Sequence, residues 1–235
     1  MISSFTPRKG EVPMRQLVYK DLFFFRVTWL VNLIVPLVLF MLDPSGELLF
    51  SMSCLFITLS SVMTLTFRDE RNNSDIIINS LPVSRKDIII ARYVSSAIFI
   101  VGGILSTMLV VFLVRGIVVI GDIGTYHPNL YIEIPWYEVI NGAVYAVFFV
   151  VTFFPSYYVT RSKVARSIVS GASMVVGGIA WIFIGDGLDE TTPSFIEWIM
   201  NPVHIGVFIV GGIILAIVYI ASMFLTIKIY ETRDL

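Results

Sequence analysis

The side chains best suited to chemistry in the apolar part of this sequence are the hydroxyls of segment 47–67. Ser53, Ser60 and Thr64 follow one another at offsets that place them on one face of a helix. Such a row has two interpretations. In the first, the hydroxyls form a polar lining for a translocation path. In the second, they make interhelical hydrogen bonds worth about 0.6 kcal/mol each. Packing is the more common role of such hydroxyls, and the translocation path is kept as the functional alternative.

The sequence lacks the motifs of the common catalytic sites. It has no H-E-x-x-H, no G-x-S-x-G and no pair of acids inside an apolar segment. One cysteine, Cys54, and two histidines, His127 and His204, cannot assemble a Cys/His metal cluster. There is also no G-x-x-x-x-G-K-[ST], so the chain has no P-loop for ATP. We therefore expect a protein that is not an enzyme and binds no cofactor directly.

The composition indicates a protein whose main solvent is lipid. Hydrophobic residues make up 57% of the 235 residues and charged residues 14%, against about 45–50% and about 25% in soluble domains. A spanning helix needs roughly 20 apolar residues. Continuous, non-alternating runs of that kind predict helices and exclude barrel strands. We expect an all-α integral membrane protein with one domain, 1–235, and six transmembrane helices: 22–42, 47–67, 88–120, 138–160, 167–185 and 203–228.

The charges between these segments predict the orientation. The N-terminal arm 1–21, the loop after 67, the loop after 160 and the C-terminal tail contain the lysines and arginines that lie between spans. The three opposite loops, 43–47, 121–137 and 186–202, contain acidic residues and no lysine or arginine. By the positive-inside rule, both termini are cytoplasmic and 186–202 is outside. Membrane lipids are therefore partners, and no nucleic-acid partner is expected.

The cytoplasmic loop 68–87 begins with charged residues and then becomes amphipathic. Ser74 or Asp75 is suited to cap a short helix that continues through 76–79. Pro82 ends that helix, because the residue before a proline avoids the α region. The pattern predicts a short helix that lies beneath the membrane with an exposed Ile/Leu face. After Pro82, Ser84 with Asp87 three residues later predicts a second helix cap, at the start of the third span.

The exposed Ile/Leu face of the short helix is expected to be covered by another apolar surface. The bilayer interface is one candidate cover, and a groove on a cytosolic partner is the other. On the second hypothesis the apolar knob consists of Ile76, Ile77, Leu81 and Pro82. Its charged rim consists of Asp69, Glu70, Arg71, Asp75, Arg85 and Lys86.

Several pieces of the sequence resemble the permeases of ABC-2 type transporters, in particular the small bacterial group that includes the phenol-soluble-modulin exporter permeases. The N-terminal stretch 14–22 resembles the interfacial helix that precedes the first span in that group. The matching pieces of the loop are Arg-Asp-Glu at 68–70, Asn-Ser-Asp at 73–75, Asn-Ser-Leu-Pro-Val-Ser-Arg-Lys at 79–86 and Arg-Tyr at 92–93.

This resemblance implies a type V exporter fold and a permease subunit that dimerises, as a homodimer or heterodimer. It also implies two copies of a separate cytosolic ABC ATPase, on which ATP and Mg²⁺ bind. Members of the family export amphipathic peptides, lipids or drugs. The outer segment 186–202 would be re-entrant, and the location would be the bacterial cytoplasmic membrane.

Two other functions remain open at this point. The first is an ion-coupled secondary transporter, which usually needs a carboxylate or a broken helix in the middle of the membrane. The second is a membrane immunity or sensor protein that transports nothing. An ATPase that co-purifies with the chain separates the exporter from both.

Overall fold

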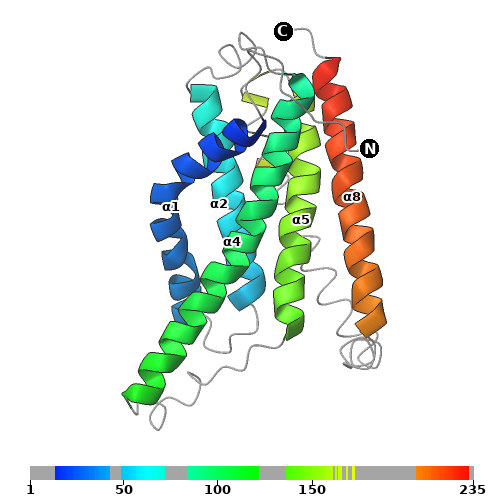
Figure 1. Ribbon diagram of the computed structural model, residues 1–235. Helices are drawn as coiled ribbons and strands as arrows, with labels where there is room; N and C mark the ends of the chain where they lie inside the picture. Colours follow the sequence, from blue (N-terminus) through cyan, green and yellow to red (C-terminus); the bar gives the residue numbers. More distant parts are fainter. Residues whose placement is uncertain are drawn as a thin grey trace, which may run out of the picture.

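The computed structural model describes residues 14–42, 49–71, 84–121, 136–160 and 205–232, with residues 162, 164, 165, 168, 171 and 172. The described part is helical and contains no strand. Its five long helices are α1 (Met14–Leu42), α2 (Leu49–Arg71), α4 (Arg85–Ile120), α5 (Trp136–Val159) and α8 (Ile205–Glu231). They lie side by side as a bundle, and α4 runs obliquely across it (Figure 1).

Four of these helices are long and apolar enough to cross a membrane. The qualifying stretches are Leu49–Asp69, Arg85–Ile117, Val139–Val159 and Ile209–Glu231. They coincide with the second, third, fourth and sixth predicted spans. The first predicted span lies within α1, and the fifth, 167–185, lies almost entirely outside the described residues. The chain is thus a multi-pass, all-helical membrane protein, while six spans and cytoplasmic termini stay predictions.

The start of α4 follows from its local sequence. Ser84 has extended backbone angles, and its side chain accepts a hydrogen bond from the amide of Asp87 at 3.1 Å. This bond satisfies one of the unpaired amides of the first turn. The predicted cap at Ser84 is confirmed. At 36 residues, α4 is about 54 Å long, which exceeds the roughly 30 Å of bilayer hydrocarbon and requires tilt or protrusion.

Two helix boundaries differ from the predicted ones. The second helix continues to Arg71, so the charged residues 68–71 form its last turn and do not lie in a loop. The predicted interfacial stretch 14–22 is continuous with the first span in α1, although the first turns run obliquely to the rest (Figure 1). Helices extend past the hydrophobic span because backbone hydrogen bonding is also favourable at the interface.

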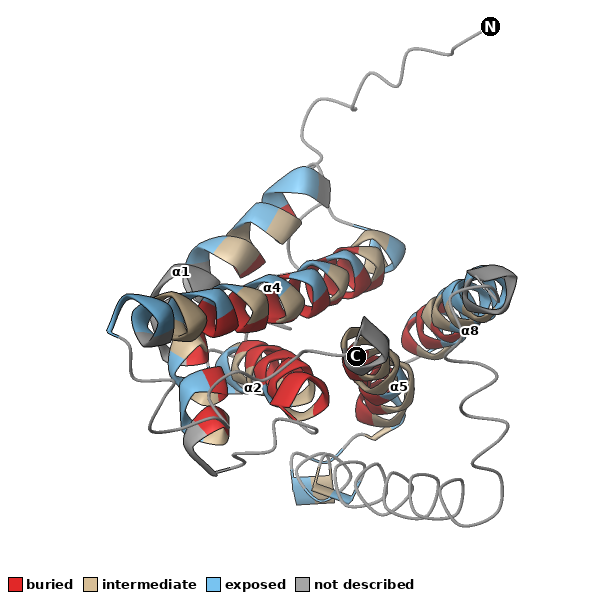
Figure 2. Ribbon diagram, turned by 90° about the horizontal axis from the view of Figure 1, so that it is seen from below, coloured by how far each residue is buried: buried red, intermediate tan, exposed pale blue. Residues whose placement is uncertain are grey.

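The core lies where α2, α4 and α5 meet. Aromatic side chains of α5 form much of it, with Phe149, Phe153 and Tyr157 stacked along one face at centroid distances of 5.2 and 5.6 Å. Figure 2 shows buried residues facing the centre and exposed residues facing outward. Only 11% of the spanning stretch of α8 is buried against the rest of the described structure. Its outer isoleucines and valines are compatible with lipid contact, because lipid tails are as apolar as these side chains.

Candidate functional site

A cluster of buried ionic side chains joins three helices at one end of the bundle. Arg92 of α4 is 6% exposed, and its Nη1 lies 3.0 Å from Oδ1 of Asp21 of α1, which is 2% exposed. Its Nη2 pairs with Oδ2 of Asp69 near the end of α2. One guanidinium therefore bridges two carboxylates from two other helices. We refer to Asp21, Asp69 and Arg92, together with Lys20, as the ion cluster.

Lys20 completes the cluster at its outer edge. Its Nζ lies 3.8 Å from both Oδ1 of Asp21 and Oδ1 of Asp69. Burial and the neighbouring Arg92 cation lower the pKa of Lys20, and the charge of Asp21 only partly opposes this. Ser95 of α4 donates a hydrogen bond of 3.2 Å to Oδ2 of Asp21. With two cations and two carboxylates the cluster is formally neutral, which is the condition under which buried charges are tolerated.

Two small cavities flank Arg92, each of about 10 Å³. Leu17, Lys20 and Asp21 line one with Arg92, and three tyrosines of α5 and α8, Tyr157, Tyr158 and Tyr230, line the other with Asp69. Each volume is close to the minimum for a single water. Nη1 of Arg92 and Oδ1 of Asp21 are close but not aligned for a hydrogen bond. A water in the first cavity is suited to satisfy both atoms.

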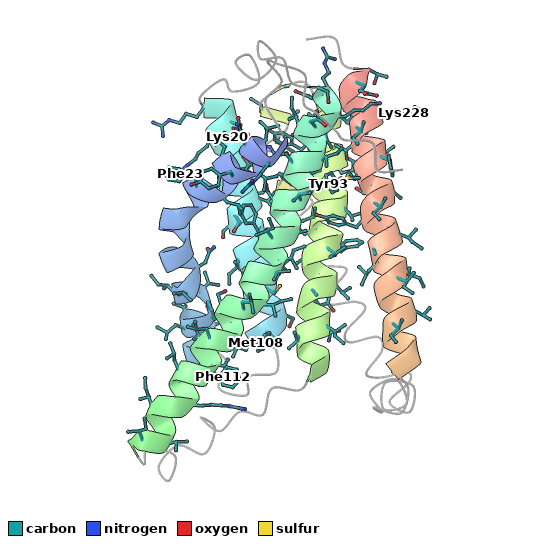
Figure 3. All side chains as sticks on the ribbon, in the orientation of Figure 1. Lys20, Phe23, Tyr93, Met108, Phe112 and Lys228 are labelled. Carbon is teal, nitrogen blue, oxygen red and sulfur yellow. The ribbon has the colours of Figure 1, made fainter. Side chains whose placement is uncertain are left out.

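The ion cluster lies at the end of the bundle that carries most of the described basic residues. Figure 3 shows Lys20 and Lys228 toward one end and Phe112 toward the other. The last turn of α2 and the first turn of α4 are also at the first end, so both helices meet segment 72–83 there (Figure 1). This is the end at which the charge pattern places the cytoplasm.

Three of the predicted rim residues, Asp69, Arg85 and Lys86, lie close to other helices of the chain. Asp69, 16% exposed, faces Arg92 and Lys20. Nη1 of Arg85 donates to the carbonyl oxygens of Tyr230 and Glu231 at the end of α8, at 3.5 and 3.3 Å. Nζ of Lys86 lies 3.7 Å from Oε1 of Glu231. These contacts anchor both ends of the predicted coupling segment to the bundle.

The remaining residues of the predicted coupling site are either exposed or lie outside the residues that the structure describes. Arg71 is exposed at the end of α2. Glu70 lies in the same turn, but its side chain is not among the described ones. The residues of the predicted knob and the remaining rim residue fall outside the described residues: Asp75, Ile76, Ile77, Leu81 and Pro82.

The hydroxyl row of α2 is divided between two environments. Ser53 is fully buried in the bundle, whereas Ser60 and Thr64 are half-buried. The hydroxyl of Ser60 has two acceptors within hydrogen-bonding distance, Oδ1 of Asn32 in α1 at 3.3 Å and the carbonyl oxygen of Ile57 at 3.0 Å. Contact with another helix is what the packing interpretation requires, and the role of this row in a translocation path stays a prediction.

Sequence reasoning missed a second polar cluster, which joins α4, α5 and α8. The hydroxyl of Tyr93 lies 2.8 Å from Oγ of Ser222 and 2.9 Å from Oγ1 of Thr226. Ser222 also donates to the carbonyl of Val151 at 2.9 Å, and Tyr219 donates to the carbonyl of Tyr93 at 2.6 Å. The available signal was the spacing of Tyr219, Ser222 and Thr226 by three and four residues, which places them on one face of a helix.

The comparisons with known proteins agree with this picture. No curated protein and no solved structure matches the chain. The family model described as ABC-2 family transporter protein matches residues 16–231, which include every long helix of the structure except the first two residues of α1. The chain therefore belongs to the ABC-2 family of transporter proteins, as a permease of an ABC transporter.

Proposed function

We propose that this permease is the membrane subunit of an ATP-driven exporter. The observation that carries the proposal is the family match over residues 16–231. ATP binds to a separate ABC ATPase, present in two copies, and two permease subunits enclose the transport pathway. The cargo is an amphipathic peptide, lipid or drug, and the membrane is the bacterial cytoplasmic membrane.

The contact with the ATPase is proposed to involve the segment between α2 and α4. Ile76, Ile77, Leu81 and Pro82 form the apolar knob of this contact. The rim consists of Asp69, Glu70, Arg71, Asp75, Arg85 and Lys86. An exposed aliphatic side chain contributes about 1.5–3 kcal/mol when a groove covers it, and the charged rim adds specificity more than affinity. The anchoring of Asp69 and Arg85 to neighbouring helices supports a segment with both ends held by the bundle.

Ion-coupled transport has less support in the described residues. A coupling carboxylate must bind and release an ion or a proton within the membrane. Asp21, the buried carboxylate of α1, is paired with Arg92 and accepts a hydrogen bond from Ser95. These contacts engage both oxygens of Asp21, so this carboxylate is not placed to bind and release an ion. ATP hydrolysis by a separate subunit is therefore a simpler energy source to propose than ion coupling.

The test is to purify the chain with and without a candidate ABC ATPase encoded next to it. The chain alone is expected to hydrolyse no ATP, because it has no P-loop. The complex is expected to hydrolyse ATP, and substitution of the ATPase's P-loop lysine is expected to abolish this activity. Turnover by the permease alone, free of contaminating ATPase, would contradict the division of labour.

The coupling segment is tested with two substitutions in that complex. Ile77→Asp removes apolar contact area, and Glu70→Arg reverses a rim charge without changing the knob. A protein groove is disrupted by both, whereas a membrane surface accepts the added arginine of Glu70→Arg. Both variants should insert normally, and their co-purification with the ATPase should fall. Unchanged co-purification and hydrolysis in both variants would refute the coupling role.

A further inference from the structure

The ion cluster contains one side chain that touches three helices at once. Arg92 extends from α4, pairs with Asp21 of α1 through Nη1 and pairs with Asp69 of α2 through Nη2. We propose that Arg92 is a positioning residue for transport, because it holds the adjoining ends of α1, α2 and α4 as one rigid unit. The rigid unit stands on the structure alone, and its use in transport rests on the proposed function.

The shape of the guanidinium gives this role to arginine. Its two Nη groups lie in a planar fork with a fixed separation, so a displacement of either carboxylate lengthens one of the two ion pairs. A lysine in the same place supplies one point charge and cannot face both carboxylates in fixed geometry. Two of the three side chains are almost completely buried: the exposed fraction is 6% for Arg92 and 2% for Asp21. The cavities beside Arg92 each have room for about one water, so few waters can take the place of a broken ion pair.

The position of the cluster along the chain explains what the unit would do. Asp69 is two residues before the end of α2, and Arg92 is seven residues after the start of α4. A displacement applied where these two helices meet segment 72–83 would thus reach α1 through Asp21 and Lys20. The described contacts of α4 with α8 are of a different kind. Tyr93 shares neutral hydrogen bonds with Ser222 and Thr226 of α8, while Arg85 and Lys86 contact the last turn of α8 near the surface. Neutral hydrogen bonds are weaker than charge-assisted ones, so we expect movement between the unit and α8 to be easier than movement within the unit.

Stability alone does not account for such a cluster. Apolar residues that replace a buried ion pair often leave a protein as stable as before, while removal of one partner leaves an uncompensated charge. A variant without any charge on the bridge is therefore the informative one. Asp21→Asn, Asp69→Asn and Arg92→Met combined remove the three charges of the bridge together and leave only Lys20, whose one-third exposed side chain can reach solvent. This variant is expected to keep the fold but to lose the fixed spacing of the helices.

The spacing is measured by pulsed electron paramagnetic resonance on the purified permease in lipid nanodiscs. Spin labels are placed on the exposed positions Gln16 of α1 and Phe67 of α2, as Gln16→Cys and Phe67→Cys, in a Cys54→Ser background. The parent protein is expected to show a narrow distance distribution. The triple variant should show a broadened distribution, at a melting temperature close to that of the parent. An equally narrow distribution in the triple variant would overturn the proposal.

Two further variants keep the test decisive. Arg92→Lys retains the charge and avoids the burial of an unpaired carboxylate pair, so it reports on the bridge even where the triple variant fails to fold. It should also broaden the distribution. The matched control, Arg85→Gln, removes the contacts of the Arg85 side chain with the last turn of α8 and should leave the Gln16–Phe67 distribution unchanged. Equal broadening by Arg85→Gln would show general loosening and would contradict the assignment to Arg92.

The role in transport is tested on the complex with the ATPase, without nucleotide and with ATP and vanadate. The Gln16–Phe67 distance should stay constant, whereas the distance from Phe67 to a label on exposed Leu225 of α8 should shift. A nucleotide-dependent change in the Gln16–Phe67 distance of the native cluster would overturn the proposal. Failure of any ATPase to bind would instead contradict the proposed function, and the measurements on the permease alone would still decide whether the unit is rigid.

Discussion

The backbones of α5 and α2 come into direct contact at Gly142 and Phe50. A Cβ atom at position 142 would lie 3.0 Å from the carbonyl oxygen of Phe50 and 3.1 Å from Cβ of Cys54. Nearly all real Cβ contacts are longer than this. Close approach of small residues is a main source of helix association in membranes, where the hydrophobic effect does not drive helices together. This contact helps to position the aromatic core of α5 against α2.

We therefore predict that Gly142→Ala destabilises the bundle by about 1–3 kcal/mol, as overpacking typically does. The added methyl group meets backbone, which cannot move away as a flexible side chain can. Thermal melting in detergent would measure the effect. Gly103→Ala, whose Cβ would lie 3.6 Å from Cys54, and Gly116→Ala, with nothing within 4 Å, are the matched controls. Equal melting temperatures for all three variants would contradict the close contact.

A second prediction concerns the ion cluster. Arg92→Gln removes the nearer and more buried of the two cations beside Asp21, and the loss of one partner of a buried pair typically costs about 3–5 kcal/mol. Lys20→Gln should have a much smaller effect, because Lys20 is one-third exposed and the protein lowers its pKa. A lowered pKa means that the folded protein disfavours the charged form of this lysine. Melting temperatures of the two variants would show the order, and a larger loss for Lys20→Gln would refute it.

A third prediction concerns the hydroxyl of Tyr93, which lies within hydrogen-bonding distance of both Ser222 and Thr226. Tyr93→Phe keeps the ring contacts with Phe154 and Tyr219 and removes only the oxygen. The expected loss is about 1 kcal/mol, within the range measured for polar contacts between membrane helices. Tyr219→Phe, which loses one bond to the carbonyl of Tyr93, is the comparison. Proteolysis of α8 should be faster in Tyr93→Phe than in the parent protein, and unchanged rates would argue against this anchor.

A fourth prediction concerns topology. Cysteines introduced at Gly124 and Glu190 should react with a membrane-impermeant reagent added to intact cells, while cysteines at Asn72 and Lys163 should not. The reason is the absence of lysine and arginine from loops 121–137 and 186–202. Native Cys54 is buried in the bundle and gives little background. Labelling of position 163 by the impermeant reagent from outside the cell would contradict the six-span arrangement.

The sequence by itself determined the properties that depend on neighbouring residues. Long apolar runs predict spanning helices because lipid leaves backbone groups no partner outside the helix. The start of α4 was predictable because the bond between Ser84 and Asp87 joins residues three positions apart. The hydrophobic pattern of the spans and the family resemblance likewise require no knowledge of how the helices pack.

Only the tertiary structure decided which distant residues meet. Asp21 and Arg92 are 71 positions apart in the sequence, and each could as well have been an interfacial charge facing lipid headgroups. Arg85 and Lys86 were expected at the rim of a partner contact, and the structure shows them against the last turn of α8. A continuous apolar run does not reveal which face of a helix meets which neighbour, because lipid and protein interior are similarly apolar. The pairing of helices is instead decided by a few small and polar side chains, such as Gly142 and Arg92, whose partners become adjacent only when the bundle is assembled.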